Sequence, residues 1–115
     1  MDTQALPHEE WGTFFDDLSR DYEEGLVDVT VRTDSLSDAP LITGLPLLGI
    51  QLNTKGSDAG SITIMAGQSE DDAISHTVMG VTQVHVARTA DGDVDTVQID
   101  APDPPQTHIR FLSSI

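Results

Sequence analysis

The histidines are the side chains best suited to chemistry in this sequence. There are four of them, His8, His76, His85 and His108, and no two stand at the spacing of a metal-binding pair. His85 alternates with Val84 and Val86, and His108 alternates with Ile109, so both are expected on the outer face of a sheet, where they could meet. Together with His76 they could form a metal or acid–base site. We interpret them instead as separate surface or hydrogen-bonded histidines.

His76 belongs to the run Ser75-His76-Thr77, inside an apolar segment. With an aspartate it could complete a Ser-His-Asp set, but an acidic chain offers such sets by chance and no nucleophile turn is present. Asp91-Gly92-Asp93-Val94-Asp95 has alternating carboxylates without the glutamate that closes a calcium loop, and a hairpin turn explains it. The nucleotide-binding, zinc-protease and hydrolase motifs are also missing from the sequence. We therefore predict no catalytic, cofactor-binding or metal-binding residue.

An apolar run, Leu45-Pro46-Leu47-Leu48-Gly49-Ile50, is the other segment of interest. Its proline and glycine could mark a bulge or a close backbone approach. One interpretation is the entry of a core strand. The other is an apolar interface or groove, for which Leu47 and Gly49 are the candidate residues.

Charge limits the partners of this chain. Its 115 residues include 20 acidic and 5 basic side chains, for a formal net charge of -15, and no cysteine. Such a chain is repelled by nucleic acids and by anionic lipid, so neither is expected as a partner. The acids are spread along the whole chain, which favours a solvated acidic surface of the kind found in salt-rich cytosols. No apolar run reaches the roughly 20 residues that span a membrane, and we expect a cytoplasmic protein.

The elements that would position these residues follow from the hydrophobic periods. Residues 1–6 are expected to form a flexible tail, and residues 7–115 a single domain. An amphipathic helix is predicted from Pro7 to about Gly25, because Trp11 begins a run of apolar residues at helical spacing. We expect this helix to fill the core.

The rest of the chain reads as strands. Alternation predicts strands over residues 26–33, 48–52, 61–67, 74–78, 81–89, 94–101 and 107–113. Residues 34–46 are expected to form a loop whose leucines and isoleucine tuck under the sheet, and residues 55–60 a hairpin turn. The expected fold class is α+β: an N-terminal amphipathic helix, then five or six of these segments as antiparallel strands in local hairpins. These would form a bent sheet or half-open barrel.

Several motifs together resemble a family of short uncharacterised bacterial proteins. They are Pro7-x-x-Glu10-Trp11-x-x-Phe14-Phe15-x-x-Leu18-Ser19-Arg20, Gly25-Leu26-Val27, Leu45-Pro46-Leu47-Leu48-Gly49-Ile50 and Ile74-Ser75-His76-Thr77-Val78. The resemblance covers nearly the whole chain and implies a stand-alone domain of unknown function, without an activity or cofactor to transfer.

Two functional hypotheses remain. The first is a non-enzymatic interaction module that uses a free sheet edge or the apolar segment 41–50, with a second copy or another protein as its partner. The alternative is a small-ligand-binding protein or minor enzyme whose barrel mouth gathers His76, His85 and His108. A ligand-sized pocket beside these histidines would favour the alternative.

Overall fold

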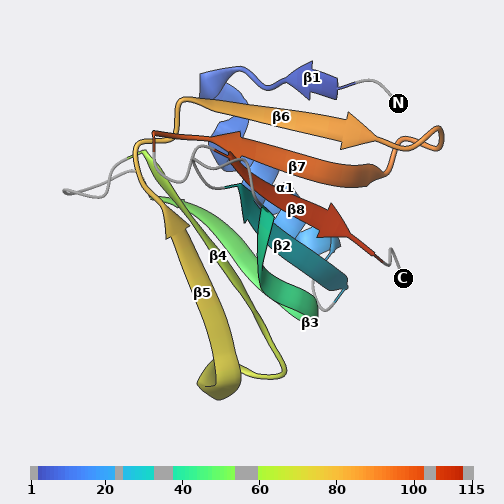
Figure 1. Ribbon diagram of the computed structural model, residues 1–115. Coiled ribbons are helices and arrows are strands. Elements are labelled where there is room, and N and C mark those ends of the chain that lie inside the picture. The colour runs from blue at the N-terminus through green and yellow to red at the C-terminus, as the bar shows by residue number, and fades with distance from the viewer. Residues whose placement is uncertain (1–2, 23–24, 33–37, 54–59, 103–105, 113–115) are drawn as a thin grey trace.

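The chain forms mostly antiparallel sheet with one short helix near the N-terminus (Figure 1). The computed structural model describes residues 3–22, 25–32, 38–53, 60–102 and 106–112. Short 3-10 turns lie at His8–Glu10 and Glu70–Asp72. The helix and strands are α1 (Trp11–Asp21), β1 (Thr3–Ala5), β2 (Leu26–Arg32), β3 (Asp38–Asn53), β4 (Ser61–Gly67), β5 (Ala73–Val78), β6 (Gln83–Arg88), β7 (Val94–Asp100) and β8 (Gln106–Phe111).

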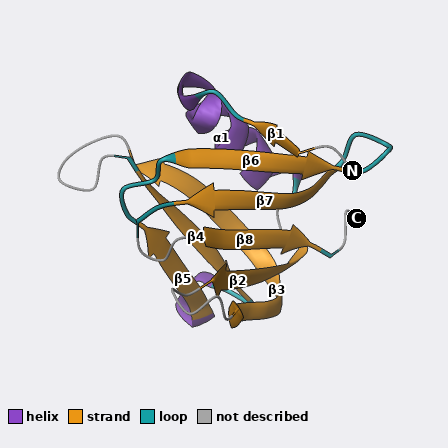
Figure 2. Cartoon of the chain, turned by 45° about the horizontal axis from the view of Figure 1, so that its top comes forward, coloured by secondary structure: helices purple, strands orange, loops and turns teal. Residues whose placement is uncertain are grey.

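All eight strands of the described chain belong to one open sheet in the order β1-β6-β7-β8-β2-β3-β4-β5. Figure 2 shows β6, β7, β8 and β2 side by side, and Figure 1 shows α1 behind β7 and β8. The sheet has more strands than the five or six predicted. Its hairpins are also not all local, because β8 pairs with β2 and β1 pairs with β6 across long stretches of chain. Hydrophobic alternation identifies strands one at a time and carries no information on such distant pairings.

The longest strand, β3, turns the corner of the sheet. Its first half pairs with β2 and its second half with β4, and register shifts interrupt both pairings. At the bend Gly44 has a φ of 61°, a left-handed conformation that favours glycine, and its N–H donates to Asp28 Oδ1 over 2.7 Å. The loop predicted over residues 34–46 is therefore wrong from Asp38 onward, and residues 34–37 lie outside the described part. Pro40, Gly44 and Pro46 are residues typical of loops, but bulges allow a strand to contain them here.

The helix covers the inner face of the sheet. Trp11, Phe15 and Leu18 are buried in one cluster with the inward-facing residues of the strands, which confirms the predicted amphipathic face. Trp11 Nε1 donates to the carbonyl oxygen of Leu6 over 3.0 Å. The Ser19 hydroxyl accepts from the backbone N–H of Ile50 over 2.8 Å and donates to its carbonyl oxygen over 3.0 Å. The helix is thereby fixed to the backbone of β3 by a side chain as well as by packing.

The segment expected as a flexible tail contains an edge strand. Thr3–Ala5 pairs with β6, and the backbone N–H of Leu6 donates to the carbonyl oxygen of Val84 over 2.8 Å. The strand is only three residues long, too short for the alternation of its side chains to be recognised in the sequence. Residues 1 and 2 of the expected tail and residues 55–59 of the expected hairpin turn lie outside the described residues.

Candidate functional site

The three candidate histidines of the strands do not gather at one mouth. His85 on β6 and His108 on β8 lie in one cross-strand row, separated by Gln98 on β7. Both are on the outer face, because their chain neighbours are buried, so they are about 10 Å apart from strand spacing alone. His76 on β5 pairs with the buried Ile64 and so lies on the inner face of the opposite end of the sheet. The alternative hypothesis, a mouth that gathers all three histidines, is therefore wrong.

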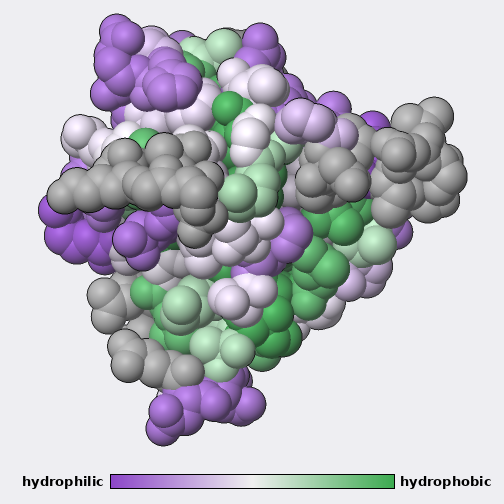
Figure 3. All heavy atoms as spheres, turned by 90° about the vertical axis from the view of Figure 1, so that its left-hand side faces the viewer, coloured by the Kyte–Doolittle hydropathy of each residue, from purple (hydrophilic) through white to green (hydrophobic). Residues whose placement is uncertain are grey.

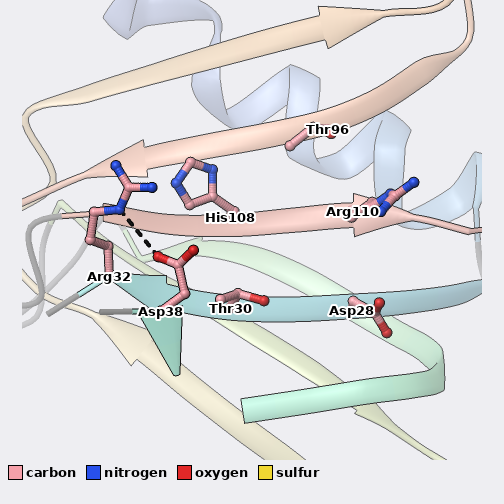
Figure 4. Close-up of a pocket in the computed structure, with 7 residues that line it drawn as sticks. All are labelled: Asp28, Thr30, Arg32, Asp38, Thr96, His108 and Arg110. Carbon is pink, nitrogen blue, oxygen red and sulfur yellow. Dashed lines mark hydrogen bonds and ion pairs between the residues drawn. The ribbon is translucent and has the colours of Figure 1, made fainter. Parts of the chain in front are cut away.

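A polar hollow of about 290 Å³ lies on the outer face over β2, β7 and β8 (Figure 4). Its lining side chains are Asp28, Thr30, Arg32, Asp38, Thr96, His108 and Arg110. The alternation of β2 and β8 turns five of these residues outward and leaves their chain neighbours in the core, while Asp38 belongs to β3 and Thr96 to β7. Two of the chain's four arginines, Arg32 and Arg110, line the hollow at opposite ends, together with the aspartates Asp28 and Asp38.

Charges of both signs surround His108 in this hollow. Arg32 Nε and Asp38 Oδ1 form an ion pair of 3.2 Å, drawn as a dashed line in Figure 4. Partial burial lowers the pKa of His108 below 6.5, and Arg32 lowers it further, while Asp38 and Asp100 oppose the shift. The shift favours the neutral form of His108, which can accept or donate a hydrogen bond. Because positive and negative groups alternate, the hollow suits a ligand that carries both charges.

His85 has its own polar partners on the same face. Its Nε2 lies 3.0 Å from Gln83 Oε1 and 3.3 Å from Asp100 Oδ2. These contacts match the predicted interpretation of a separate, hydrogen-bonded histidine. Within the part of the chain that the structure describes, no three histidine or acidic residues are grouped to hold a metal ion.

The two apolar-segment candidates have different positions. Leu47 is fully buried in the core, so it is unavailable to a partner, as the core-strand interpretation requires. Gly49 lines a hollow of about 430 Å³ between α1, β3 and β4, together with Asp16, Ser19 and Met65 among others. A Cβ atom at Gly49 would have no neighbour within 4 Å, so the space of this hollow next to Gly49 is not filled by other side chains.

The edge strand β5 is the element with the least protection. In natural proteins, short length, charged residues, proline or bulges prevent edge strands from pairing with strands of other chains. Ala73–Val78 has six residues, contains neither charge nor proline, and pairs with β4 through six consecutive positions without a register shift. Its other edge is unpaired among the described strands. The three residues that directly precede β5 in the sequence, residues 70–72, are acidic.

Side chains on and beside β5 are unusually apolar for this surface. Ile74 is 44% exposed, and Met65 on the neighbouring strand β4 is 36% exposed. Figure 3 shows the molecule from the side on which β5 lies, and hydrophobic side chains gather in the lower half of this view. The other edge strand, β1, has only three residues. In the sequence, this edge is marked by the uncharged residues 73–78 that follow the acidic residues 70–72. The alternation there predicted a strand but did not indicate that the strand lies at an edge.

His76 lies in the middle of this edge with an unsatisfied polar atom. Its Nε2 is buried without a hydrogen-bond partner among the described residues, and desolvation lowers the pKa of the ring below 6.5. On its own strand the same face carries Ile74 and Val78, and on β4 it carries Ile62, Ile64 and Ala66. A buried polar atom without a partner is uncommon in native structures and calls for an explanation.

A family model described as a family of unknown function (DUF5335) matches residues 2–114. The chain belongs to this family. The predicted resemblance to a family without an assigned activity is confirmed, while the bacterial origin of that family stays a prediction. No curated protein and no solved structure is significantly similar to the chain. Membership of the DUF5335 family therefore leaves the function to be argued from the surface of the molecule itself.

None of the described helices has the length and apolar character needed to cross a membrane.

Proposed function

We propose that the protein is a non-enzymatic interaction module that binds an extended polypeptide segment at the free edge of β5. The observation that carries this proposal is a regular, uncharged six-residue edge strand in a chain of net charge -15. Unpaired N–H and C=O groups along such an edge bind an added strand through main-chain hydrogen bonds. Specificity would come from the alternate side chains of the inner face, chiefly from Ile74, which is exposed, whereas Val78 is fully buried.

Charge favours a particular direction for the added strand. Residues 70–72, which directly precede β5, are all acidic. A segment running antiparallel to β5 would bring its C-terminal end to these carboxylates, so a basic residue there would be favoured. Flanking acids repel wrong partners of like charge and leave the uncharged strand as the preferred contact.

A peptide titration tests this function. The probe is the peptide Lys-Thr-Val-Thr-Ile-Thr-Lys, which alternates β-branched apolar and polar residues between basic ends. With ¹⁵N-labelled protein we expect amide shift changes concentrated in residues 73–78. Ile74→Lys, which places a charge on the inner face of the edge, should weaken binding at least tenfold. Leu112→Lys is the matched control, because Leu112 is also 44% exposed but lies beyond β8, and it should bind like the wild type.

Shift changes at β1 or over the whole surface, or no shift at millimolar peptide under conditions in which the chain is monomeric, would contradict strand addition at β5.

A second candidate function is supported by the hollow beside His108. Its volume of about 290 Å³ is at the lower end of the roughly 300–1,000 Å³ typical of ligand pockets. Asp28 and Arg110 face each other across neighbouring strands, so a small zwitterion could contact both. In this case glycine, titrated into the same labelled protein, would shift the amides of His108 and Arg110 and leave β5 unchanged.

A further inference from the structure

The edge strand β5 is self-complementary. From Ile74 to Val78 it reads Ile-Ser-His-Thr-Val, so a β-branched apolar residue stands at each end, a hydroxyl residue lies inside each end, and the histidine is at the centre. A twofold axis perpendicular to the sheet at His76 would pair the strand with a copy of itself. Each residue would then face one of its own kind on the same face of the sheet.

We propose that the segment bound at this edge is β5 of a second copy of the chain, paired antiparallel and centred on His76. This inference rests on the proposed function of the β5 edge and names its occupant. In this register Ile74 faces the partner's Val78, and Ser75 faces the partner's Thr77. The two sheets join into one continuous sheet of sixteen strands with the isologous contact of a twofold dimer.

The register also satisfies polar groups that the single chain leaves open. His76 faces the partner's His76 with Cβ atoms about 5 Å apart, close enough for one neutral imidazole to donate to the other. The Nε2 atom has no hydrogen-bond partner in the described chain and is covered there, so this bond requires the ring to turn toward the edge. Since neutral imidazole is both donor and acceptor, two identical rings can form this hydrogen bond.

A ladder of polar side chains on the outer face points to the same extension. Asn53 Nδ2 donates to Ser61 Oγ over 2.8 Å, and the hydroxyls of Thr63 and Thr77 lie 3.0 Å apart across β4 and β5. The ladder ends at Thr77, on the free edge. The partner's Ser75 would continue it by one step, and Ser–Thr pairs of this kind stabilise adjacent strands.

Like charges stay apart in this register. Asp72 falls opposite the partner's Gly80, and Ala73 opposite the partner's Met79, which is 46% exposed in the single chain. Shifting the axis to Ser75 would instead place Asp72 opposite the partner's Val78 and Ile74 opposite the partner's His76, which loses the complementarity. The His76-centred register is therefore the one that the side chains favour.

Sedimentation equilibrium is the first test. In 0.5 M NaCl the wild type should show a concentration-dependent mass that approaches twice 12.3 kDa, and Ile74→Lys should stay at the mass of one chain. Leu112→Lys should behave like the wild type. High salt is used because two chains of net charge -15 repel each other, and the Debye length falls from about 10 Å at 0.1 M to about 3 Å at 1 M.

Cross-linking then tests the register, and the absence of native cysteine makes the assay clean. Ser75→Cys and Thr77→Cys change exposed side chains and should leave the fold intact. With a short bifunctional thiol reagent, an equal mixture of the two variants should cross-link several-fold more than either variant alone. A stronger product from Ser75→Cys alone would overturn the His76-centred register.

The two proposals fail in different ways. A chain that remains monomeric at all concentrations but still binds the peptide at β5 would overturn self-association and leave the interaction module standing, with another protein as the partner. A chain that neither self-associates nor binds the peptide would overturn both.

Discussion

At the residue scale, His108 shows how a few charges set the protonation of one side chain. Arg32 and burial hold its pKa below 6.5, and Asp38 and Asp100 act in the opposite direction. A folded-state pKa below the unfolded value means that the unfolded chain binds more protons between the two values. The contribution of His108 to stability is therefore fully present above pH 6.5 and declines as the pH falls through and below that value.

Opposite substitutions in the Arg32–Asp38 pair should move this pKa in opposite directions. Asp38→Asn removes a carboxylate that raises the pKa and leaves the guanidinium of Arg32 without its 3.2 Å partner, so the pKa of His108 should fall further. Arg32→Gln removes a positive charge, so the pKa should rise. An NMR titration of the His108 ring protons measures both changes. Shifts of the same sign in the two variants would contradict the assigned causes.

At the element scale, the bend of β3 decides how the sheet is built. The strand serves two neighbours because it changes direction near Gly44, where the left-handed φ of 61° and the hydrogen bond to Asp28 fix the corner. Its pairings with β2 and with β4 both contain register shifts, at which β3 has extra residues that allow it to bend. The corner turns β4 and β5 away from the direction of β6, β7 and β8, as Figure 1 shows, and leaves β5 as an edge.

Two glycines of β3 should respond differently to the same substitution. Gly44→Ala places a Cβ atom on a left-handed residue and should lower the free energy of unfolding by roughly 1–2 kcal/mol. Gly49→Ala is the matched control, because its φ is not left-handed and its Cβ would meet no atom within 4 Å. It should leave stability unchanged or raise it by up to about 1 kcal/mol. Urea unfolding of both variants checks the difference, and equal losses would mean that the corner does not depend on the Gly44 conformation.

At the scale of the whole molecule, net charge is the dominant property. Twenty acids face five basic residues, and the arginine ion pairs of the described surface, Arg20 with Asp17 and Asp21 and Arg32 with Asp38, have side chains that are 41–72% exposed. Exposed pairs contribute little to stability. Screening by salt should therefore remove more repulsion than attraction.

The melting temperature is expected to rise as NaCl increases from about 0.02 to about 1 M. Most of the rise should occur at the low end, where the Debye length changes fastest. Thermal melts of the wild type and of Ile74→Lys provide the measurement. A rise in both separates screening within one chain from self-association through β5. A flat or falling melting temperature would indicate that the acids form specific favourable pairs or ion sites instead of a solvated surface.

Local patterns in the sequence were enough to predict the helix and most strands. Trp11, Phe15 and Leu18 recur at the helical period, and Val27, Val29 and Val31 at the strand period, because each element must bury one face. The same alternation placed His85 and His108 on one outer face. The composition alone excluded cysteine chemistry, and the net charge of -15 predicts that nucleic acids and anionic membranes are poor partners.

Only the tertiary structure decided what depends on contacts between distant segments. The pairing of β8 with β2, the inclusion of Thr3–Ala5 and the bend of β3 all arise from backbone hydrogen bonds, which every residue except proline can donate and which leave little trace in the sequence. For the same reason the sequence could not separate His76 from the other two histidines or show that β5 ends the sheet. An edge is defined by the absence of a neighbour, and that absence is a property of the assembled sheet.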